Sequence, residues 1–378
     1  MQKDKIDVII PAFKAHKTII RAVSSIACQT VADDVSVVIV DDACPEGDYN
    51  DVVDFFSKCL NIRTIRLDKN GGPGVARQTG IDGMDGEFIA FLDADDLLSS
   101  TRSLEILRNA IKEDEAYKCA SGAFWNEKFG GVPAINISHM MVWVFGKLYR
   151  REFLNTHAIR FNNTRANEDS GFNHIVSMLC DNPDEKIRFV DEFVYEYRDD
   201  NPNSITSIND GQYWYDQCTL GGIDNMIYAI EHVRKHKPFS GAAISSTVNM
   251  MLQCYWYYSE VMQKAKPMSI QLWEYIKKFY HRCYKPIEGI VTDEAFRIEY
   301  SRMLKTLITK STSIGVIPEI TPYQFMDKLR TEEYDPNLIY EIWDEMKYDE
   351  GFQEIIRNNI ACGVCPEGYT DKPMEAQT

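Results

Sequence analysis

The chain has 378 residues, of which 44% are hydrophobic and 26% charged, and its formal net charge is −16. These proportions are typical of a globular protein with a sizeable core, and they exclude disordered, collagen-like and coiled-coil chains. At about 150 residues per domain, the length predicts two domains. The acidic balance argues against constitutive nucleic-acid binding, because a protein that binds nucleic acid carries an electropositive face.

The sequence carries no targeting or disulfide signal. The first ten residues lead directly into a strand pattern and hold no secretory signal. No apolar run approaches the roughly 18 residues that a membrane-spanning helix needs. The ten cysteines are scattered, which is typical of reduced thiols in a cytosol. Cys362-Gly-Val-Cys365 is the only CxxC pair, and without a second pair it is a weak metal or redox signal. We therefore expect a cytoplasmic protein with no transmembrane segment.

The N-terminal half alternates strand and helix patterns. Buried strands are expected at Ile6–Pro11, Val35–Val40, Ile62–Leu67 and Phe88–Leu92. Helices are expected between them, at Thr18–Gln29, Asp51–Leu60 and Gly74–Gly80, with Thr18 as a possible N-cap and Pro73 suited to a first turn. Alternation without hairpin signals predicts parallel strands joined by crossover helices. Ligands of such sheets bind at the carboxyl ends of the strands.

The composition changes near residue 210. The segments that follow are rich in aromatic residues and methionine, and helices are expected at Tyr213–His232, Ile244–Met262, Ile270–Arg282, Asp293–Ser311 and Pro322–Lys328. We place a boundary within residues 205–215. The sequence thus predicts an α/β domain over residues 1–210 and a helical domain over residues 211–378, for which we expect a role in substrate binding or in forming a homo-oligomer.

Acidic side chains follow the fourth expected strand. The apolar run Ile89–Leu92 leads into Asp93, Ala94, Asp95 and Asp96. Carboxylates held together in this way repel one another unless a cation neutralises them, and hard oxygen ligands suit Mg²⁺ or Mn²⁺. The alternative is a solvated acidic turn or a helix N-terminus, where aspartate is common.

A glycine-rich segment, Asn70-Gly-Gly-Pro-Gly74, precedes the third expected helix. It is not followed by Gly-Lys-Ser/Thr and does not fit GxGxxG, so neither a P-loop nor a dinucleotide site is predicted. Its glycines permit close backbone approach. Arg77, three residues further on, is placed to offer a fixed fork to a phosphate or a base carbonyl.

These motifs together resemble family 2 glycosyltransferases. The order and spacing match over four segments: IIPAFKAHKTIIRAVSSIACQT, VVIVDDACPEG, NGGPGVARQTGI and GEFIAFLDADD. The resemblance is strong over residues 5–100 and continues more loosely through Lys147, the run Asn167-Glu168-Asp169, and Arg198. It implies a GT-A type nucleotide-sugar-binding domain, with a mostly parallel central sheet flanked by helices.

The resemblance also implies roles for residues at the first two strand ends. Pro11, Ala12 and Phe13 match the loop that lines the nucleoside pocket, and Asp41 matches the acidic residue that contacts the uracil or ribose. Asp42 either shares that role or fixes its own loop. Where the family commonly has Gly-Ser after the acidic pair, this chain has Ala43-Cys44-Pro45, and Gln78 replaces the usual asparagine.

By the same resemblance, Asp93 and Asp95 form the DxD motif. Asp93 would lie towards the ribose, and Asp95 would ligate a metal, Mn²⁺ or Mg²⁺, that bridges the diphosphate, with Asp96 assisting either. Arg77 matches the basic residue near the base and phosphates.

The remaining family positions concern the transfer step. Asp169, with Glu168 second, matches the carboxylate that acts as general base, which an attacking acceptor hydroxyl requires. Lys147 would reach acceptor or donor, and Arg198 resembles the loop that closes over the diphosphate. Each position has a structural alternative. Asp169 would be an acidic residue at a helix N-terminus, Lys147 an exposed solubilising lysine, and Arg198 part of a surface turn.

The sequence therefore predicts a metal-dependent, inverting, non-processive glycosyltransferase of the hexosyltransferase type. Its donor would be a nucleotide-diphosphate sugar, most simply a UDP-sugar. Its acceptor would be a hydroxyl of a glycan, a lipid-linked sugar or a modified nucleobase. Two alternatives stay open, a nucleotidyltransferase of related fold and a non-catalytic module that binds nucleotide sugars.

Overall fold

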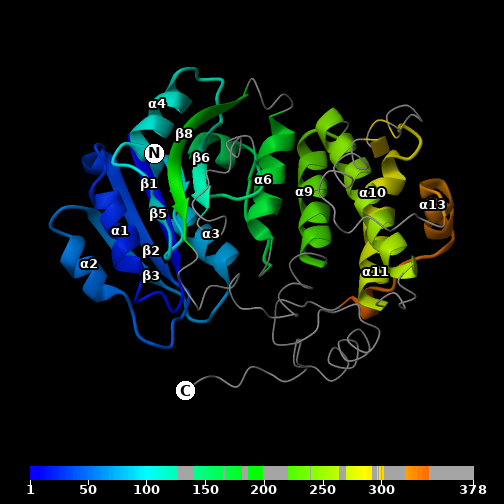
Figure 1. Ribbon diagram of the computed structural model, residues 1–378, viewed down its shortest axis with the longest axis horizontal. Helices are drawn as coiled ribbons and strands as arrows, with labels where there is room; N and C mark the ends of the chain where they lie inside the picture. The colour runs from blue at the N-terminus through cyan, green and yellow to red at the C-terminus, as the bar shows by residue number, and fades with distance from the viewer. Residues whose placement is uncertain are drawn as a thin grey trace. The chain divides into compact units, whose positions relative to one another are not determined.

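The computed structural model describes residues 1–126, 140–164, 167–180, 186–198, 220–238, 240–263, 270–291 and 320–339, together with residues 296, 298, 300 and 301. The chain divides into two compact units, Met1–Ile208 and Asn209–Thr378, which are coloured blue to green and green to orange in Figure 1. The roles expected of the two units stay predictions.

An eight-stranded mixed sheet forms the first unit, with the strand order β3-β2-β1-β4-β7-β6-β8-β5 (Figure 1). Its strands are β1 (Gln2–Ala12), β2 (Val35–Asp41), β3 (Asn61–Arg66), β4 (Gly86–Phe91), β5 (Leu97–Leu98), β6 (Cys119–Asn126), β7 (Lys147–Arg150) and β8 (Ile187–Tyr197). Strands β1 to β4 run parallel, as predicted. Strand β7 then pairs antiparallel with both β4 and β6, which the sequence did not indicate.

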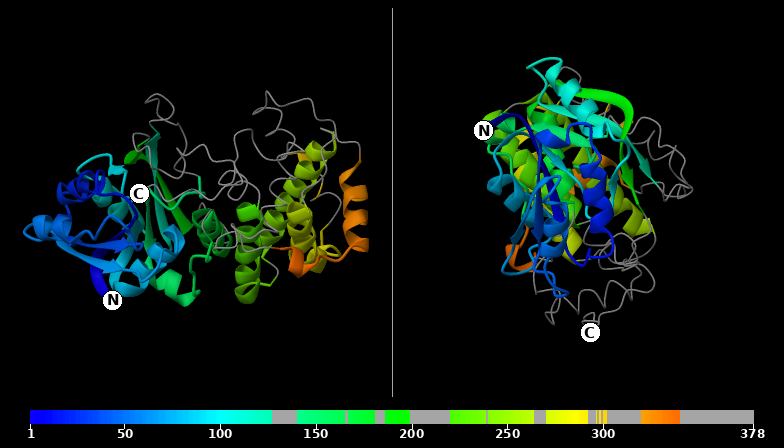
Figure 2. Two further views of the ribbon diagram at one scale, coloured as in Figure 1. Left: turned by 90° about the horizontal axis from the view of Figure 1, so that it is seen from below. Right: turned by 90° about the vertical axis from the view of Figure 1, so that its left-hand side faces the viewer.

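Helices cover both faces of this sheet (Figure 2). They are α1 (Ile19–Ala27), α2 (Asn50–Phe56), α3 (Pro73–Gly83), α4 (Ser103–Lys112), α5 (Arg151–Thr156) and α6 (Glu168–Leu179), with a 3-10 turn η1 (Ala32–Asp34). Thr18 stands at the start of α1 but does not cap it with its side chain, because its hydroxyl donates to the Ala15 carbonyl instead.

Because helices cover both faces of the sheet, the sequences of its first strands are continuous apolar runs. Ile6, Val8 and Ile10 of β1 point into one core, which they share with α1, α2 and α4. Ile9 points to the other face, where α3 packs so closely that a Cβ on Gly80 would lie 2.3 Å from the Ile9 Cγ2 atom. A strand buried on both sides needs apolar residues at every position.

Aromatic packing on the second face fixes α6. The Phe161 and Phe172 rings stack with centroids 4.4 Å apart, and Phe172 also meets Phe91 of β4 and Tyr149 of β7 edge-on. Such pairs contribute about 0.5–1.5 kcal/mol each beyond burial. The first turn of α6 is thereby held beside the carboxyl end of β4.

The second unit is helical in its described part. It contains α9 (Gly222–His236), α10 (Gly241–Gln263), α11 (Ile270–Phe279), a π turn η5 (Tyr280–Tyr284), η6 (Lys285–Ile287), α13 (Pro322–Thr331) and η7 (Pro336–Leu338). The helices expected at Ile244–Met262, Ile270–Arg282 and Pro322–Lys328 fall within these elements. Most of Asp293–Ser311, the first residues of Tyr213–His232, and the Cys362 and Cys365 pair lie outside the described residues.

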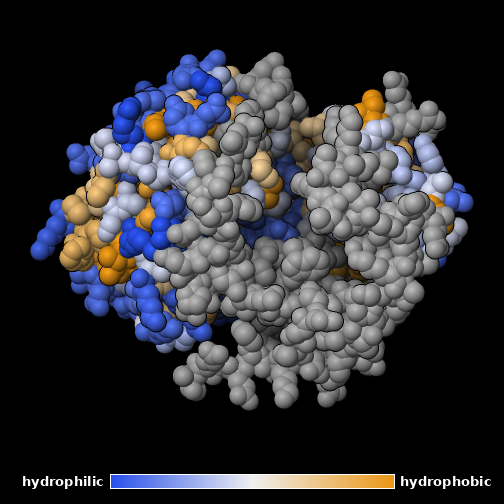
Figure 3. Space-filling model, viewed as in Figure 1, coloured by the Kyte–Doolittle hydropathy of each residue, from blue (hydrophilic) through white to orange (hydrophobic). Residues whose placement is uncertain are grey.

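Within the described part of the chain, no helix combines the length and apolarity that crossing a membrane requires. On the face seen in Figure 3, hydrophilic residues cover most of the described first unit, with small apolar areas between them. Exposed large apolar side chains include Phe55 on α2 and Ile20 on α1, and some exposed apolar residues are normal on a globular surface.

Candidate active site

The carboxyl end of β4 carries the DxD residues, and a buried tyrosine holds their turn. Tyr195 of β8 donates its hydroxyl to Asp96 Oδ2 at 2.6 Å and accepts the Asp93 backbone N–H at 3.2 Å. The second Asp96 oxygen accepts the Arg198 backbone N–H at 2.8 Å. Asp96 is 1% exposed, and burial with the nearby charges of Asp93 and Asp95 raises its pKa well above the usual range. Asp96 therefore anchors the turn that presents the DxD pair.

Arg77 joins this turn to the start of α6. Its guanidinium donates to Asp93 Oδ1 at 2.7 Å and to Glu168 Oε1 at 2.6 Å, and the side chain is almost fully buried. Burial opposes its charge, but Asp93, Glu168 and Asp169 outweigh that cost and raise the pKa of Arg77 further. The sequence predicted that the Arg77 guanidinium contacts a phosphate or base. In the structure, two of its nitrogens donate to the carboxylates of Asp93 and Glu168.

Gly74 makes this connection possible. A Cβ at position 74 would lie 2.8 Å from the Cγ atom of Glu168 and 3.2 Å from the Asn162 carbonyl oxygen. Any larger residue would push α3 away from the first turn of α6. The glycine-rich segment thus serves close helix packing as well as the turn itself.

Asp169 is half-buried at the first turn of α6, with Oδ1 accepting the Ser170 backbone N–H at 2.7 Å. Burial and the adjacent Glu168 charge raise the pKa of Asp169 to about 7, against the opposing effect of Arg77. Burial likewise raises the pKa of Glu168, which Arg77 opposes. A carboxylate with a pKa near neutrality is suited to accept a proton from a hydroxyl.

Lys147 lies at the start of β7 and is 4% exposed. Its amine donates to the Phe145 carbonyl at 3.4 Å, and burial lowers its pKa to about 8, while Cys119 and Asp169 act in the opposite direction. The lysine is therefore an internal group that interacts electrostatically with Asp169. The alternative of an exposed solubilising lysine is wrong.

Asp42 fixes the glycine-rich segment. Its two carboxylate oxygens accept the backbone N–H groups of Gly71 at 2.6 Å and Gly72 at 2.8 Å, and its carbonyl accepts the Asn70 amide at 3.2 Å. Gly72 has a φ of 84°, a conformation that favours glycine. This is the loop-fixing alternative that the sequence left open for Asp42.

Asp41 is also bonded to protein groups. Its carboxylate accepts the Cys44 backbone N–H at 2.8 Å and forms an ion pair with Arg66 of β3, and the residue is fully buried. Asp41 thereby holds the loop between β2 and α2. Its expected contact with a uracil or ribose stays a prediction.

The first-strand loop presents one exposed ring. Ala12 is buried at the end of β1, Pro11 is half-buried, and Phe13 is 44% exposed. Arg198 lies at the end of the described β8 segment, where its side chain pairs with Glu196 at 2.6 Å. Ser204 and Thr206, which with Arg198 resemble the loop that closes over the diphosphate, lie outside the described residues.

The structure thus brings Arg77, Asp93, Glu168 and Asp169 into one group, and it ties Asp41 and Asp42 into the neighbouring loops. Sequence reasoning missed three supporting residues: Tyr195, Arg66, and Arg21, which donates to the Asp95 carbonyl at 2.9 Å. No local signal distinguishes them, because Tyr195 is one of several aromatic residues in an alternating strand and the two arginines stand in ordinary helix and strand positions.

The charge balance of this group fits a divalent cation. The guanidinium of Arg77 faces Asp93, Glu168 and Asp169, and Asp95 adds a further carboxylate on the turn that Asp96 anchors. Excess carboxylate oxygens of this kind suit Mg²⁺ or Mn²⁺, which use one or two protein carboxylates and complete their shell with substrate phosphates.

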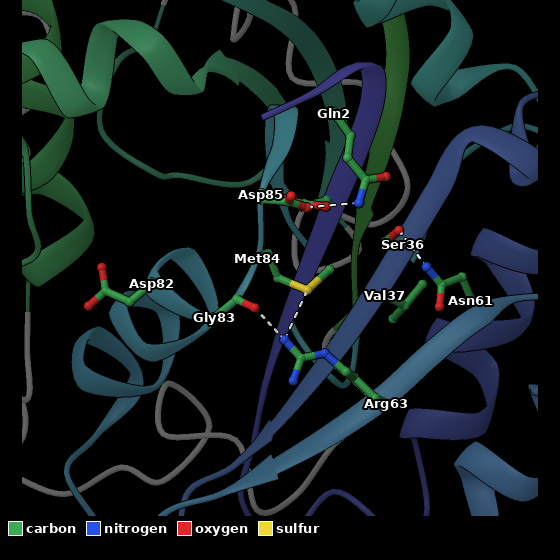
Figure 4. Close-up of a pocket in the computed structure, with 10 residues that line it drawn as sticks. Gln2, Ser36, Val37, Asn61, Arg63, Asp82, Gly83, Met84 and Asp85 are labelled. Atoms are coloured by element: carbon green, nitrogen blue, oxygen red, sulfur yellow. Dashed lines mark hydrogen bonds between the residues drawn. The ribbon is translucent and has the colours of Figure 1, made fainter.

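A separate cavity of about 350 Å³ lies at the opposite end of the sheet (Figure 4). It is lined by residues at the amino-terminal ends of the strands, including Gln2 and Asn61. Gln2 donates to Asp85 at 3.0 Å, Asn61 donates to Ser36 at 2.8 Å, and Arg63 bonds to the Gly83 carbonyl. The strand polarity separates this cavity from the acidic group, so we do not assign it to the same site.

Comparison with known proteins agrees with this geometry. Residues 7–168 match the family described as Glycosyl transferase family 2. The match covers 162 of the 378 residues, or about 43% of the chain. The match begins in β1 and ends at Glu168, so it includes both acidic strand ends and the Arg77 bridge.

Two similar curated proteins are glycosyltransferases. EpsJ of Bacillus subtilis, an uncharacterized glycosyltransferase, is 26% identical over 226 residues, which are 54% of this chain and 63% of the relative. Glycosyltransferase GlyG of Streptococcus pneumoniae is 23% identical over 270 residues, 62% of this chain and 87% of the relative. The chain spans under two thirds of the length of EpsJ.

The fold is shared with a solved glycosyltransferase structure. TarS 1–349 of Staphylococcus aureus in complex with UDP-GlcNAc superposes with a TM-score of 0.61 at 18% identity, covering 80% of this chain and 88% of that one. This likeness confirms the expected GT-A type α/β fold.

Proposed function

We propose that the protein transfers a sugar from a nucleotide-diphosphate donor to an acceptor hydroxyl. The observation that carries this proposal is the Asp93–Arg77–Glu168 chain of ion pairs, which joins the DxD turn of β4 to the first turn of α6. A donor bound at the DxD turn would therefore lie beside Asp169. The match of residues 7–168 to the glycosyl transferase family 2 model supports the same reaction class.

Asp169 is the proposed general base. Its pKa of about 7 means that Asp169 is deprotonated in a large fraction of the molecules at neutral pH. In those molecules it is able to accept the acceptor's proton. Glu168 is committed to Arg77 at 2.6 Å, so it orients the guanidinium and leaves Asp169 as the proton acceptor. Attack opposite the leaving group in one displacement would invert the anomeric carbon.

Asp95, with Asp93, is the proposed holder of Mn²⁺ or Mg²⁺. The metal would offset negative charge on the leaving diphosphate. Arg77 keeps the Asp93 carboxylate in place from the protein side, and the Arg21 contact fixes the Asp95 backbone. We propose that Arg77 also acts on the donor indirectly, by positioning these carboxylates, and its direct contact with a phosphate or base stays a prediction.

The donor and acceptor are proposed by class. A UDP-sugar is the first donor to test, since TarS was crystallised with UDP-GlcNAc. We propose that Phe13, which is exposed just after the end of β1, contacts the nucleoside. The acceptor would be a hydroxyl of a glycan, a lipid-linked sugar or a modified nucleobase, with a single sugar transferred per encounter. The helical unit is proposed to bind that acceptor or a second copy of the chain.

The test is a screen of nucleotide sugars with Mn²⁺, read as release of nucleoside diphosphate. We expect hydrolysis of at least one donor, lost on addition of a chelator and in Asp95→Ala. In Asp169→Asn the rate should fall by about 10²–10⁴-fold while donor affinity stays near that of the parent. If Asp95→Ala and Asp169→Asn both released nucleoside diphosphate at the rate of the parent protein, the proposal would be contradicted.

The same screen separates the two alternatives. Pyrophosphate release from a nucleoside triphosphate would identify a nucleotidyltransferase. Tight binding of a nucleotide sugar without turnover, unchanged by Asp169→Asn, would identify a binding module. The family match of residues 7–168 favours transfer over both.

A further inference from the structure

A second cluster of potential metal ligands lies in the loops that follow β1 and β2. His16, Cys44 and Glu46 each offer one ligand atom, and these atoms all lie within 4.8 Å of one another. His16 comes from the loop between β1 and α1, and the other two come from the loop between β2 and α2. The two loops are adjacent because Ala12 pairs with Asp41 at the ends of the two parallel strands.

The His16 ring is oriented as a ligand would be. Its Nε2 atom lies 2.9 Å from the Asp48 carbonyl oxygen, which can only accept a hydrogen bond, so in the neutral ring the proton is on Nε2 and the lone pair is on Nδ1. Nδ1 is buried and makes no hydrogen bond to any residue that the structure describes. Metal-bound histidines donate their other ring N–H to a carbonyl or carboxylate in this way.

The ring is also held in place from one side. Tyr49 stacks on His16 with ring centroids 4.4 Å apart, and its hydroxyl accepts the Ala15 backbone N–H at 3.1 Å. Tyr49 is fully buried, so the stacking partner is fixed. The lone pair of Nδ1 is therefore aimed in a set direction before any ligand arrives.

Cys44 and Glu46 supply complementary groups. The Cys44 sulfur is buried and accepts the Lys14 backbone N–H at 3.3 Å, so its position is fixed in the loop after β2. Glu46 is 55% exposed, and its Oε2 lies 3.6 Å from His16 Nδ1, too far for a hydrogen bond. An exposed carboxylate can rotate to close the remaining distance.

We propose that His16, Cys44 and Glu46 form a binding site for a zinc-class cation, separate from the DxD carboxylates. A thiolate, an imidazole and a carboxylate are the ligands that Zn²⁺ takes, at about 2.3 Å for sulfur and about 2.0–2.2 Å for nitrogen and oxygen. Mg²⁺ prefers oxygen ligands alone. Binding releases the Cys44 thiol proton to solvent, and water or a small ligand completes the fourth position.

Such a cation would join the two loops that flank the proposed nucleoside side. Cys44 already holds Asp41 through its backbone N–H, and His16 is three residues beyond Phe13 in the first loop. The inference does not rest on the proposed glycosyl transfer, because it concerns binding alone. Its readout is correspondingly independent of turnover.

The experiment is a Co²⁺ titration of the full chain, with Cys362→Ser and Cys365→Ser introduced to remove the CxxC pair. We expect one equivalent of Co²⁺ to give thiolate-to-metal absorption, which stoichiometric Zn²⁺ displaces and a hundredfold excess of Mg²⁺ does not. Cys44→Ser should abolish the absorption, whereas the matched Cys59→Ser, at an exposed cysteine, should retain it.

His16→Gln is a second test of the site, in case Cys44→Ser loses the absorption only because it misfolds. Because His16 is partly exposed, this variant should keep its circular dichroism spectrum while Co²⁺ binds on the order of 100-fold more weakly. Glu46→Gln should weaken binding to a smaller extent. Absence of thiolate absorption in the parent protein, or absorption that survives Cys44→Ser, would overturn the proposal.

Discussion

Replacing Asp169 by asparagine should abolish the base and yet stabilise the folded chain above neutral pH. The carboxyl titrates at about 7 in the folded protein, against an ordinary value of 3.8. A raised pKa means that the folded state binds this proton more tightly than the unfolded state does. The stabilisation from this group is therefore complete below pH 3.8 and is lost as the pH rises through 7.

The size of the effect follows from the shift. A difference of about 3 units at about 1.4 kcal/mol per unit corresponds to about 4 kcal/mol. Partial exposure of Asp169 and its coupling to Glu168 reduce this to about 2 kcal/mol as a working figure. An asparagine does not ionise, so Asp169→Asn avoids that loss and gains relative to the parent as the pH increases.

The assay is thermal unfolding of the full chain at pH 5 and pH 8, followed by circular dichroism. The measured quantity is the melting temperature of Asp169→Asn minus that of the parent. This difference should be roughly 4–8 °C larger at pH 8 than at pH 5 for a unit of about 200 residues. Asp33→Asn, at an exposed position, is the control and should show no such change. A difference that is independent of pH, or lower relative stability at pH 8, would refute the reasoning.

Two further predictions concern the scaffold. Arg151→Met should lower the free energy of unfolding in urea by about 3–5 kcal/mol. Arg151 pairs with the buried Asp7 at 2.6 Å, and without it the Asp7 carboxylate is buried without its partner charge. Asp7→Asn, which keeps the shape, should cost less. Gly80→Ala should cost about 1–3 kcal/mol, since the new Cβ would lie 2.3 Å from Ile9. Gly241→Ala, with no atom within 4 Å of the new Cβ, should not destabilise.

The sequence predicted the parallel half of the sheet because each strand there carries its own signal. Strands β1, β2 and β4 are apolar on both faces, and each is followed by a helix pattern or an acidic turn. Strand β7 has only four residues, from Lys147 to Arg150, with charged residues at both ends. Its antiparallel place between β4 and β6 depends on pairing with distant strands, which no local pattern encodes.

The candidate site was predictable as a set of residues but not as a set of contacts. Asp93, Arg77 and Glu168 were each singled out, but Arg77 was expected to face a ligand. Its pairing with Glu168 spans 91 positions of the chain and depends on how α6 packs. The Gly74 approach to Glu168 is equally nonlocal. Spacing identifies acidic strand ends, whereas packing decides which charges neutralise one another.

The acidic surplus connects the proposed chemistry to stability. One buried guanidinium holds Asp93 and Glu168 by ion pairs, and the charge of Glu168 helps to raise the pKa of Asp169. A cation at Asp95 would lower the pKa of nearby carboxylates, as any added positive charge does. The cation alone would thus favour the deprotonated form of Asp169, whereas the negative diphosphate of a donor would offset part of that effect. The ionised Asp169 that costs stability at high pH is the form that can accept the acceptor's proton.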